Sequence, residues 1–240
     1  MKIVKTKGII IAEHNMGDFD KMLTILTPNL GKIECLAKGS RKPKSLLLAG
    51  TQNFCFGDYV LYKGSDNYSM NSCEIIELFY KIRVDIDKLT YAAYITKIVN
   101  DVTTENQNNY KILQLYLNTL YVMAETEKNL NLVTSIFNIR LMSIIGYRPQ
   151  IEECINCKEK SKLKFFSIKD AGFKCENCVK QDSGAIEICE TTKDAIRYII
   201  LSDAKKIYSF TVPQDTQKEL EIISKLYLND KLEKEYKLNF

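Results

Sequence analysis

The sequence predicts an α+β protein with several domains, in which a small five-stranded β-barrel precedes an α-helical domain that carries a four-cysteine insertion. Three observations predict this fold class. Before residue 83, short apolar runs alternate with turn residues; after it, apolar residues recur at helical spacing; and two close pairs of cysteines interrupt the helical part. We therefore place the first domain boundary at residue 83, where the pattern changes.

Five strands are expected in the first domain, residues 1–82. Their apolar runs are Ile3–Glu13, Met22–Leu26, Lys32–Ala37, Phe54–Leu61 and Tyr68–Phe79. The segments between them contain Asn, Gly, Asp, Pro and Ser, which favour turns. Five strands in a domain of this size fit a closed barrel, with the OB-fold as the leading candidate, and a small β-sandwich fits the same pattern.

Five helices are expected after the boundary. Asp85 or Asp87 caps the first, which runs through Val99. The other helices cover residues 110–123, 130–145, 191–202 and 214–228, and Gly146 suits the end of the third helix. We divide this part of the chain into a first helical segment, a cysteine-rich segment and a second helical segment, at 83–149, 150–182 and 183–240.

The cysteine-rich segment has the spacing of a metal site. Cys154 and Cys157 form one CxxC knuckle and Cys175 and Cys178 another, with seventeen residues between the knuckles. A two-residue spacer lets both thiolates of a knuckle bind one ion, and zinc prefers four tetrahedral ligands. The sequence therefore predicts one structural Zn²⁺ per chain, because four thiolates leave no position open for a catalytic water. Redox dithiols or disulfides are the alternative.

The residues between the two knuckles predict a short hairpin that brings them together. Phe165–Ile168 forms an apolar run, and Ala171-Gly172 suits a turn. The metal is expected to hold the fold of a segment too small to form its own core. The remaining cysteines have no partner at ligand spacing and are expected to be small buried hydrophobic residues: Cys35, Cys55, Cys73 and Cys189.

Positive charge is concentrated near the N-terminus. The chain has a net charge of +4, whereas residues 1–45 alone hold nine Lys or Arg and four Asp or Glu. The loop 37–45 contains four of these basic residues, and Gly, Pro and Ser keep it extended. Such a loop can lay cations along a phosphate backbone, where counterion release supplies the affinity. The predicted phosphate contacts are Lys38, Arg41, Lys42 and Lys44, with Lys32 and Lys21 widening the patch.

Aromatic residues on a neighbouring strand extend this hypothesis. Tyr59, Tyr62 and Phe56 would offer faces on which bases stack. Four further basic residues would carry a DNA track onto the helical domain: Arg83, Lys97, Arg140 and Arg148. The alternative is an ordinary solvated loop beside aromatic residues of the core.

No group of residues points to catalysis, and an enzyme is not expected. His14 is the only histidine and lies in a predicted turn without a nearby nucleophile. Glycine-rich nucleotide-binding motifs are absent. Asp18 and Asp20 could hold a metal, but turn formation explains them more simply. No apolar stretch could span a bilayer and no signal peptide precedes the first strand, so we expect a cytoplasmic protein.

Several short motifs occur in an order and at a spacing that match a known family. The motifs are Gly17–Lys21 with Leu26-Thr27 and Gly31; Ala37–Arg41 with Lys44-Ser45; Phe137–Leu141 with Gly146–Pro149; and Cys154, Cys157, Phe166-Ser167, Gly172, Cys175 and Cys178. On these residues the chain resembles the RecO family of bacterial recombination mediators over essentially its whole length. It departs from the family pattern at Ala171, where a second glycine is common, and at Lys42-Pro43, in a loop often richer in arginine.

The resemblance implies an N-terminal OB-fold, a helical domain and a zinc-bearing insertion. It also implies DNA repair by the RecF-type recombination pathway, with binding to single- and double-stranded DNA and annealing of complementary strands. The implied partners are RecR, single-strand-binding protein (SSB) and, indirectly, RecA, which RecO-like proteins help to replace SSB on DNA. Association with the nucleoid during repair follows. The alternatives are a zinc-stabilised protein-interaction scaffold with little direct nucleic-acid binding and, less simply, a thiol or metal enzyme.

Overall fold

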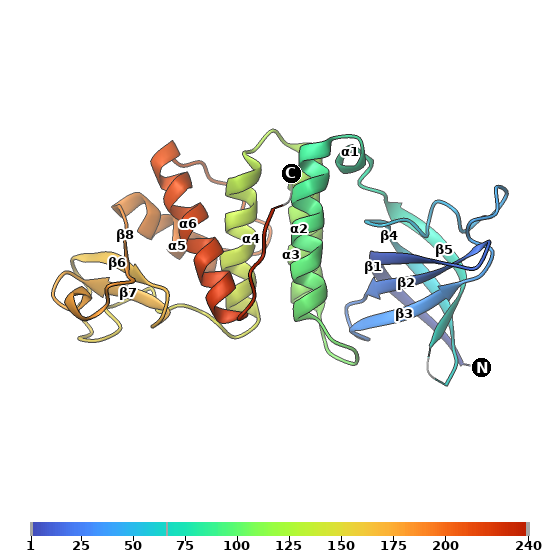
Figure 1. Ribbon diagram of the computed structural model, residues 1–240, viewed down its shortest axis with the longest axis horizontal. Helices are drawn as coiled ribbons and strands as arrows, with labels where there is room; N and C mark the ends of the chain where they lie inside the picture. Colours follow the sequence, from blue (N-terminus) through green and yellow to red (C-terminus); the bar gives the residue numbers. More distant parts are fainter. Residues whose placement is uncertain (1, 66, 239–240) are drawn as a thin grey trace. The chain divides into compact units, whose positions relative to one another are not determined.

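Five strands open the chain in this computed structural model, which describes residues 2–65 and 67–238. The strands are β1 (Lys2–Met16), β2 (Asp20–Leu26), β3 (Lys32–Ala37), β4 (Phe56–Lys63) and β5 (Tyr68–Glu77) (Figure 1). They belong to the first of two compact units, residues 1–114 and 115–240. Each unit is described by itself below.

The strands of the first unit form a ring in the order β1-β2-β3-β5-β4, and β4 pairs back onto β1. The long β1 makes this possible, because its second half pairs with β2 and its first half pairs with β4, both antiparallel. The ring closes at β3 and β5, which are parallel and share only two residue pairs, Cys35–Tyr68 and Leu36–Ser69. This is the five-stranded OB-fold that the sequence predicted, and the β-sandwich alternative is wrong.

The interior of the barrel follows from the alternation of side chains along its strands. In β4, Gly57, Tyr59 and Leu61 are buried while their neighbours are partly exposed. They join a core that includes Ile10, Leu23, Ile25, Ile33, Cys35 and Met70. Strand residues two apart lie on the same face, so one alternating run supplies the core-facing side of each strand.

The isolated cysteines divide between core and surface. Cys35 and Cys55 are fully buried, as the sequence predicted, and burial raises the pKa of the Cys35 thiol to about 12. Cys73 is only half-buried, and Cys189 is exposed at the start of a helix. The prediction of a buried residue is therefore wrong for Cys189.

Two helices follow the barrel within the first unit, α1 (Tyr80–Arg83) and α2 (Ile86–Val102). The Asp85 carboxylate caps α2 by accepting the backbone N–H groups of Asp87 and Lys88, both at 3.0 Å. The helix α1 was not predicted. The predicted last strand ran to Phe79, but β5 ends at Glu77 and Phe79 has a left-handed backbone with φ of 49°.

The helices of the second unit are α4 (Leu130–Ile144), α5 (Glu190–Leu201) and α6 (Gln214–Lys231), with most of α3 (Tyr110–Glu125). α4 packs against both α5 and α6, which explains why most of its side chains are buried. The predicted helices are confirmed at these positions. No helix in the described part of the chain has both the length and the apolar character needed to cross a membrane.

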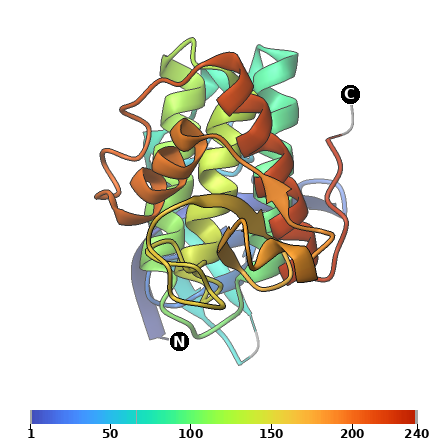
Figure 2. The ribbon, with the colours of Figure 1, turned by 90° about the vertical axis from the view of Figure 1, so that its left-hand side faces the viewer.

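The cysteine-rich segment folds as a small sheet beside these helices (Figure 2). Its strands are β6 (Leu163–Ser167) and β7 (Gly172–Cys175), and β8 (Ile186–Glu187), just after the predicted end of the segment, completes the sheet in the order β7-β6-β8. The predicted hairpin is confirmed as β6 and β7, whereas β8 was not predicted. Phe166 of β6 makes edge-to-face contacts with Phe173 of β7 and with Tyr227 of α6, at centroid distances of 6.0 and 5.6 Å.

Candidate metal centre and nucleic-acid interface

The four CxxC cysteines come together at one end of the small sheet. Their sulfur atoms all lie within 4.8 Å of one another, and the Cys157 and Cys175 sulfurs are 3.6 Å apart. None of the four is in a disulfide. Tetrahedral Zn–S bonds of about 2.3 Å place the sulfurs roughly 3.8 Å apart, so this donor set fits a four-coordinate thiophilic ion. The cluster could therefore hold a metal ion, and the disulfide alternative is wrong.

Main-chain hydrogen bonds shape the two knuckles before any ion is bound. The first knuckle is tied to β7, because the Ile155 N–H donates to the Phe173 carbonyl at 3.0 Å. The Cys178 N–H donates to the Cys175 carbonyl at 3.1 Å and closes the second knuckle as a turn. Each knuckle thus presents both of its sulfurs from a compact turn, as a shared ion requires.

Backbone donors also favour the metal-binding form of one ligand. Burial by itself raises the pKa of the Cys154 thiol, but backbone N–H groups of Cys157, Cys175 and Asn156 donate to its sulfur and lower that pKa to about 6. The thiolate is the form that binds metal. Within the same cluster the hydrogen bond with Cys157 and burial raise the pKa of the Cys178 thiol, so the chain alone favours the thiolate at Cys154 and not at Cys178.

A buried ion cluster supports the sheet beside the metal centre. The Lys174 side chain of β7 is 3% exposed, and its ammonium contacts the carboxylates of Asp182, at 2.8 Å, and Asp170. The Ser167 hydroxyl donates to the same Asp182 carboxylate at 2.5 Å. A buried ammonium needs such partners because desolvation penalises its charge. Sequence analysis missed this cluster, because a lone lysine in a strand gives no sign of its burial.

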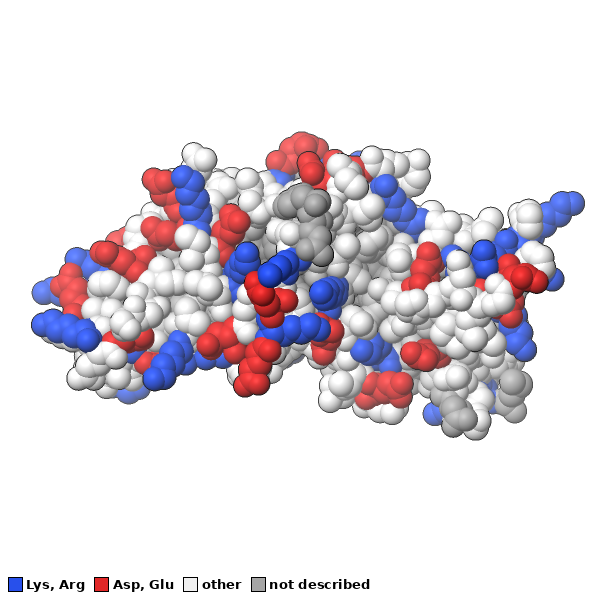
Figure 3. Space-filling model, viewed as in Figure 1, with Lys and Arg blue, Asp and Glu red and all other residues white. Residues whose placement is uncertain are grey.

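The predicted basic loop leaves the end of β3 and is exposed. Lys38, Arg41, Lys42 and Lys44 are all exposed, and a series of turns replaces regular structure as far as β4. Figure 3 shows Lys and Arg side chains at the edge of the first unit where this loop projects. The structure thus brings four of the six predicted contacts together on one surface.

Three hydrogen bonds fasten this loop to the turn between β1 and β2. The Gly39 N–H donates to the Asp20 carboxylate at 2.7 Å, and the Arg41 N–H donates to the Phe19 carbonyl at 2.9 Å. The Arg41 guanidinium also donates to the Gly17 carbonyl at 3.2 Å. Asp20, the first residue of β2, therefore anchors a loop distant in sequence, a contact that the local turn interpretation of Asp20 did not predict.

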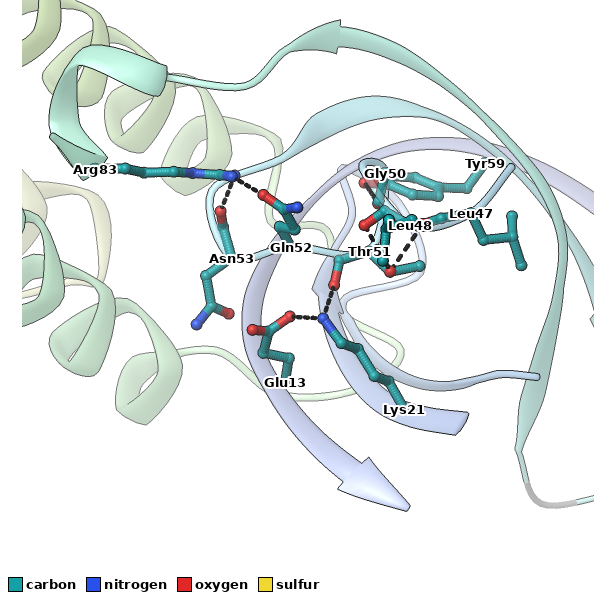
Figure 4. A network of polar contacts seen from close by, with 10 residues as sticks. All are labelled: Glu13, Lys21, Leu47, Leu48, Gly50, Thr51, Gln52, Asn53, Tyr59 and Arg83. Carbon is teal, nitrogen blue, oxygen red and sulfur yellow. Dashed lines mark hydrogen bonds and ion pairs between the residues drawn. The ribbon is translucent and has the colours of Figure 1, made fainter. Parts of the chain in front are cut away.

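The other two predicted contacts, Lys21 and Lys32, have partners within the protein. The Lys21 ammonium lies 2.7 Å from the Glu13 carboxylate and donates to the Thr51 carbonyl at 3.2 Å, with its side chain 11% exposed (Figure 4). The Lys32 ammonium donates to the main-chain and side-chain oxygens of Asn100, at 2.7 and 3.2 Å. Neither ammonium is free to extend the exposed patch in this conformation.

Two arginines of the predicted DNA track are held in the same way. Arg83 donates to the Asn53 carbonyl at 2.5 Å and to the Gln52 side chain (Figure 4). Arg140 donates to the carbonyls of Ile199 and Ile200 at 3.1 and 2.5 Å. Lys97 and Arg148 are exposed. Arg83 thus donates to oxygens of the loop before β4, and Arg140 donates to carbonyls in the last turn of α5.

The aromatic residues differ most from the prediction. Tyr59 is 1% exposed, and its hydroxyl donates to the Cys55 carbonyl at 3.0 Å, so the proposed stacking role is wrong. Tyr62 and Phe56 are half-buried. Phe19, which was not predicted as a contact, is 49% exposed with the Lys42 ammonium 5.6 Å from its ring centroid. Its position between Asp18 and Asp20 in a predicted turn was the sequence feature that could have indicated its exposure.

Comparison with known proteins was consistent along the whole chain. The family described as Recombination protein O N terminal matches residues 1–79, and Recombination protein O C terminal matches residues 83–239. DNA repair protein RecO of Acetivibrio thermocellus is 44% identical over 242 residues, which cover 100% of this chain and 96% of that relative. DNA repair protein RecO of Alkaliphilus metalliredigens is 35% identical over 227 residues, covering 94% of this chain and 92% of that relative.

Proposed function

This chain belongs to the RecO family of recombination proteins, and from that premise we propose that it is a recombination mediator in DNA repair. It binds single- and double-stranded DNA and promotes annealing of complementary strands. With RecR it helps RecA to replace SSB on DNA. The observation that carries the DNA-binding part is the exposed set of four cations on a loop fastened to the OB-fold barrel.

The loop acts through charge. Lys38, Arg41, Lys42 and Lys44 contact phosphates, and the counterions that they release supply most of the affinity. Neutralised phosphates also repel a second strand less, which favours the approach of two complementary strands. No nucleotide hydrolysis is required for this role. Lys21 and Lys32 are left out of the proposed contact set because protein oxygens already surround their ammonium groups.

The metal in this proposal is one structural Zn²⁺ per chain, held by Cys154, Cys157, Cys175 and Cys178. Four thiolates satisfy the ion and leave no site for a substrate or water. Bound zinc supplies cross-links between the two knuckles of a small segment. Its role is to hold the fold.

The test is fluorescence anisotropy of a labelled single-stranded oligonucleotide titrated with the protein at several salt concentrations. Arg41→Ala/Lys42→Ala/Lys44→Ala is expected to weaken binding and to reduce the slope of log K against log salt by about 2, because each phosphate contact on a single strand contributes about 0.7. The matched control, Lys205→Ala/Lys218→Ala/Lys225→Ala, removes three exposed lysines of the second unit and keeps most of the affinity. Absence of binding by the unmodified protein at low salt would favour the protein-interaction scaffold.

A further inference from the structure

The turn between β1 and β2 presents an aromatic ring beside the basic loop. Phe19 is 49% exposed, although the barrel strand β2 begins one residue later. Its carbonyl accepts the Arg41 N–H at 2.9 Å, and the Lys42 ammonium lies 5.6 Å from its ring centroid. An apolar ring is thus held in solvent at the point where the loop presents its cations.

The backbone that carries this ring is held on both sides. Gly17 has φ of 53°, which allows the tight turn, and Asp20 accepts the Gly39 N–H on the far side of Phe19. The Arg41 guanidinium closes the arrangement on the Gly17 carbonyl. A ligand that used the ring would therefore meet a turn whose backbone is already ordered, which reduces the entropy lost on binding.

We propose that Phe19 is a base-stacking residue for single-stranded DNA, with the phosphates flanking the stacked base on Arg41 and Lys42. The inference rests on the proposed function and adds a residue that recognises bases to a loop that recognises phosphates. Single strands fit this arrangement because their bases are free to stack on an aromatic ring, whereas those of a duplex are already stacked. The charge of the loop matches the backbone of the same ligand.

Lys42 links the two parts of this site. In the free protein its ammonium lies over the ring, a cation–π contact that is weak at an exposed position. A phosphate is a stronger, charge-assisted partner for an ammonium. When Lys42 turns to a phosphate, it uncovers a ring face for the neighbouring base.

The first experiment uses the absence of tryptophan from the chain. Phe19→Trp creates a protein with a single indole, whose fluorescence is expected to be quenched when a thymidine oligonucleotide stacks on it. Tyr80→Trp is the matched control, because Tyr80 is 66% exposed in the same unit, outside the loop and turn. Its emission is expected to change little. Anisotropy of the labelled oligonucleotide is followed in the same samples.

The outcomes separate the inference from the proposed function. Binding with unchanged Phe19→Trp emission overturns the stacking inference and leaves the DNA-binding proposal standing. Equal quenching of Phe19→Trp and Tyr80→Trp also overturns it. No binding in any sample overturns both proposals.

A second experiment measures what the ring contributes to affinity. Phe19→Ala is expected to weaken single-strand binding roughly 5- to 100-fold, the range for loss of one base–aromatic stack, and to change duplex binding less than about twofold. Phe19→Tyr retains the affinity of the unmodified protein, and an abasic oligonucleotide abolishes the difference between the unmodified protein and Phe19→Ala. Equal losses on single strands and duplex, or loss that persists on the abasic strand, would contradict stacking. An unchanged urea midpoint checks that Phe19→Ala is folded.

Discussion

At the scale of single residues, Ala171 is one of the residues of the cysteine-rich segment that have a left-handed backbone. It has φ of 58° in the turn between β6 and β7, and its carbonyl accepts the Gln150 N–H at 2.8 Å. The left-handed region costs an L-residue roughly 1–2 kcal/mol, whereas glycine enters it freely. A glycine at this position would therefore suit the observed turn better than the alanine.

We expect Ala171→Gly to raise the free energy of unfolding by about 0.5–1 kcal/mol, since relief of strain outweighs the extra flexibility of glycine in the unfolded chain. Urea denaturation followed by circular dichroism measures the change. Gly146→Ala is the matched control with opposite sign, because Gly146 has φ of 102° and an added Cβ meets no atom within 4 Å. Destabilisation by both substitutions would show that φ at Ala171 stores no strain.

Lys21 and Lys38 show how similar residues acquire different roles through their surroundings. Both are lysines close to the same loop, yet Lys21 is enclosed by Glu13 and Thr51 while Lys38 is exposed. Lys21→Met is expected to lower the free energy of unfolding by about 1 kcal/mol, because it removes a partly buried ion pair and a hydrogen bond. The same variant should leave the salt slope of DNA binding unchanged.

Lys38→Met is the converse control, with unchanged stability and a slope reduced by about 0.7. Urea unfolding and salt-dependent anisotropy on both variants measure the two quantities. A slope reduced by Lys21→Met to the same extent would mean that Lys21 leaves Glu13 and contacts a phosphate after all.

At the scale of elements, the cysteine-rich segment has only a small apolar core. Its sheet contributes Leu163, Phe166 and Phe173 to the buried apolar residues, and β8 has two residues. A segment of this size rarely folds on apolar burial alone. The ion pairs of Lys174 stabilise this segment, and a metal ion bound to the cysteine cluster would stabilise it further.

Cys157→Ser is expected to reduce bound zinc from about one per chain to a small fraction, because three thiolates and a hydroxyl bind zinc much more weakly than four thiolates. Metal analysis measures this loss, and limited proteolysis should show faster cleavage within residues 150–182. Cys189→Ser is the matched control, since Cys189 is also exposed but lies outside the cluster. Full zinc content in Cys157→Ser, or none in the unmodified protein, would refute the assignment.

At the scale of the whole molecule, the sequence predicted the elements better than their contacts. Strand β3 was predicted with its observed bounds, and the helices were found because apolar residues repeat at helical spacing. The CxxC spacing predicted which four cysteines would meet, since a knuckle is a local structure. The helix α1 and the strand β8 were missed because elements of four and two residues are too short to show a repeat of apolar residues.

Side-chain roles in the candidate interface were less predictable, because they depend on residues distant in sequence. Lys32 meets Asn100 and Arg83 meets Gln52 only once the barrel and α2 have formed. No local pattern carries that information. Tyr59 is different: it alternates with Leu61 on one face of β4, so its burial was available from the period of the strand.

The short parallel seam between β3 and β5 gives the barrel an uneven resistance to opening. Every other junction of the ring is a longer antiparallel ladder, so parting β3 from β5 breaks the fewest pairings. Regions with few hydrogen bonds open locally at low free energy while the rest of a domain stays folded. Because the basic loop leaves β3 immediately after this seam, local opening of the barrel would occur beside the loop, while the antiparallel ladders of β1 keep their register.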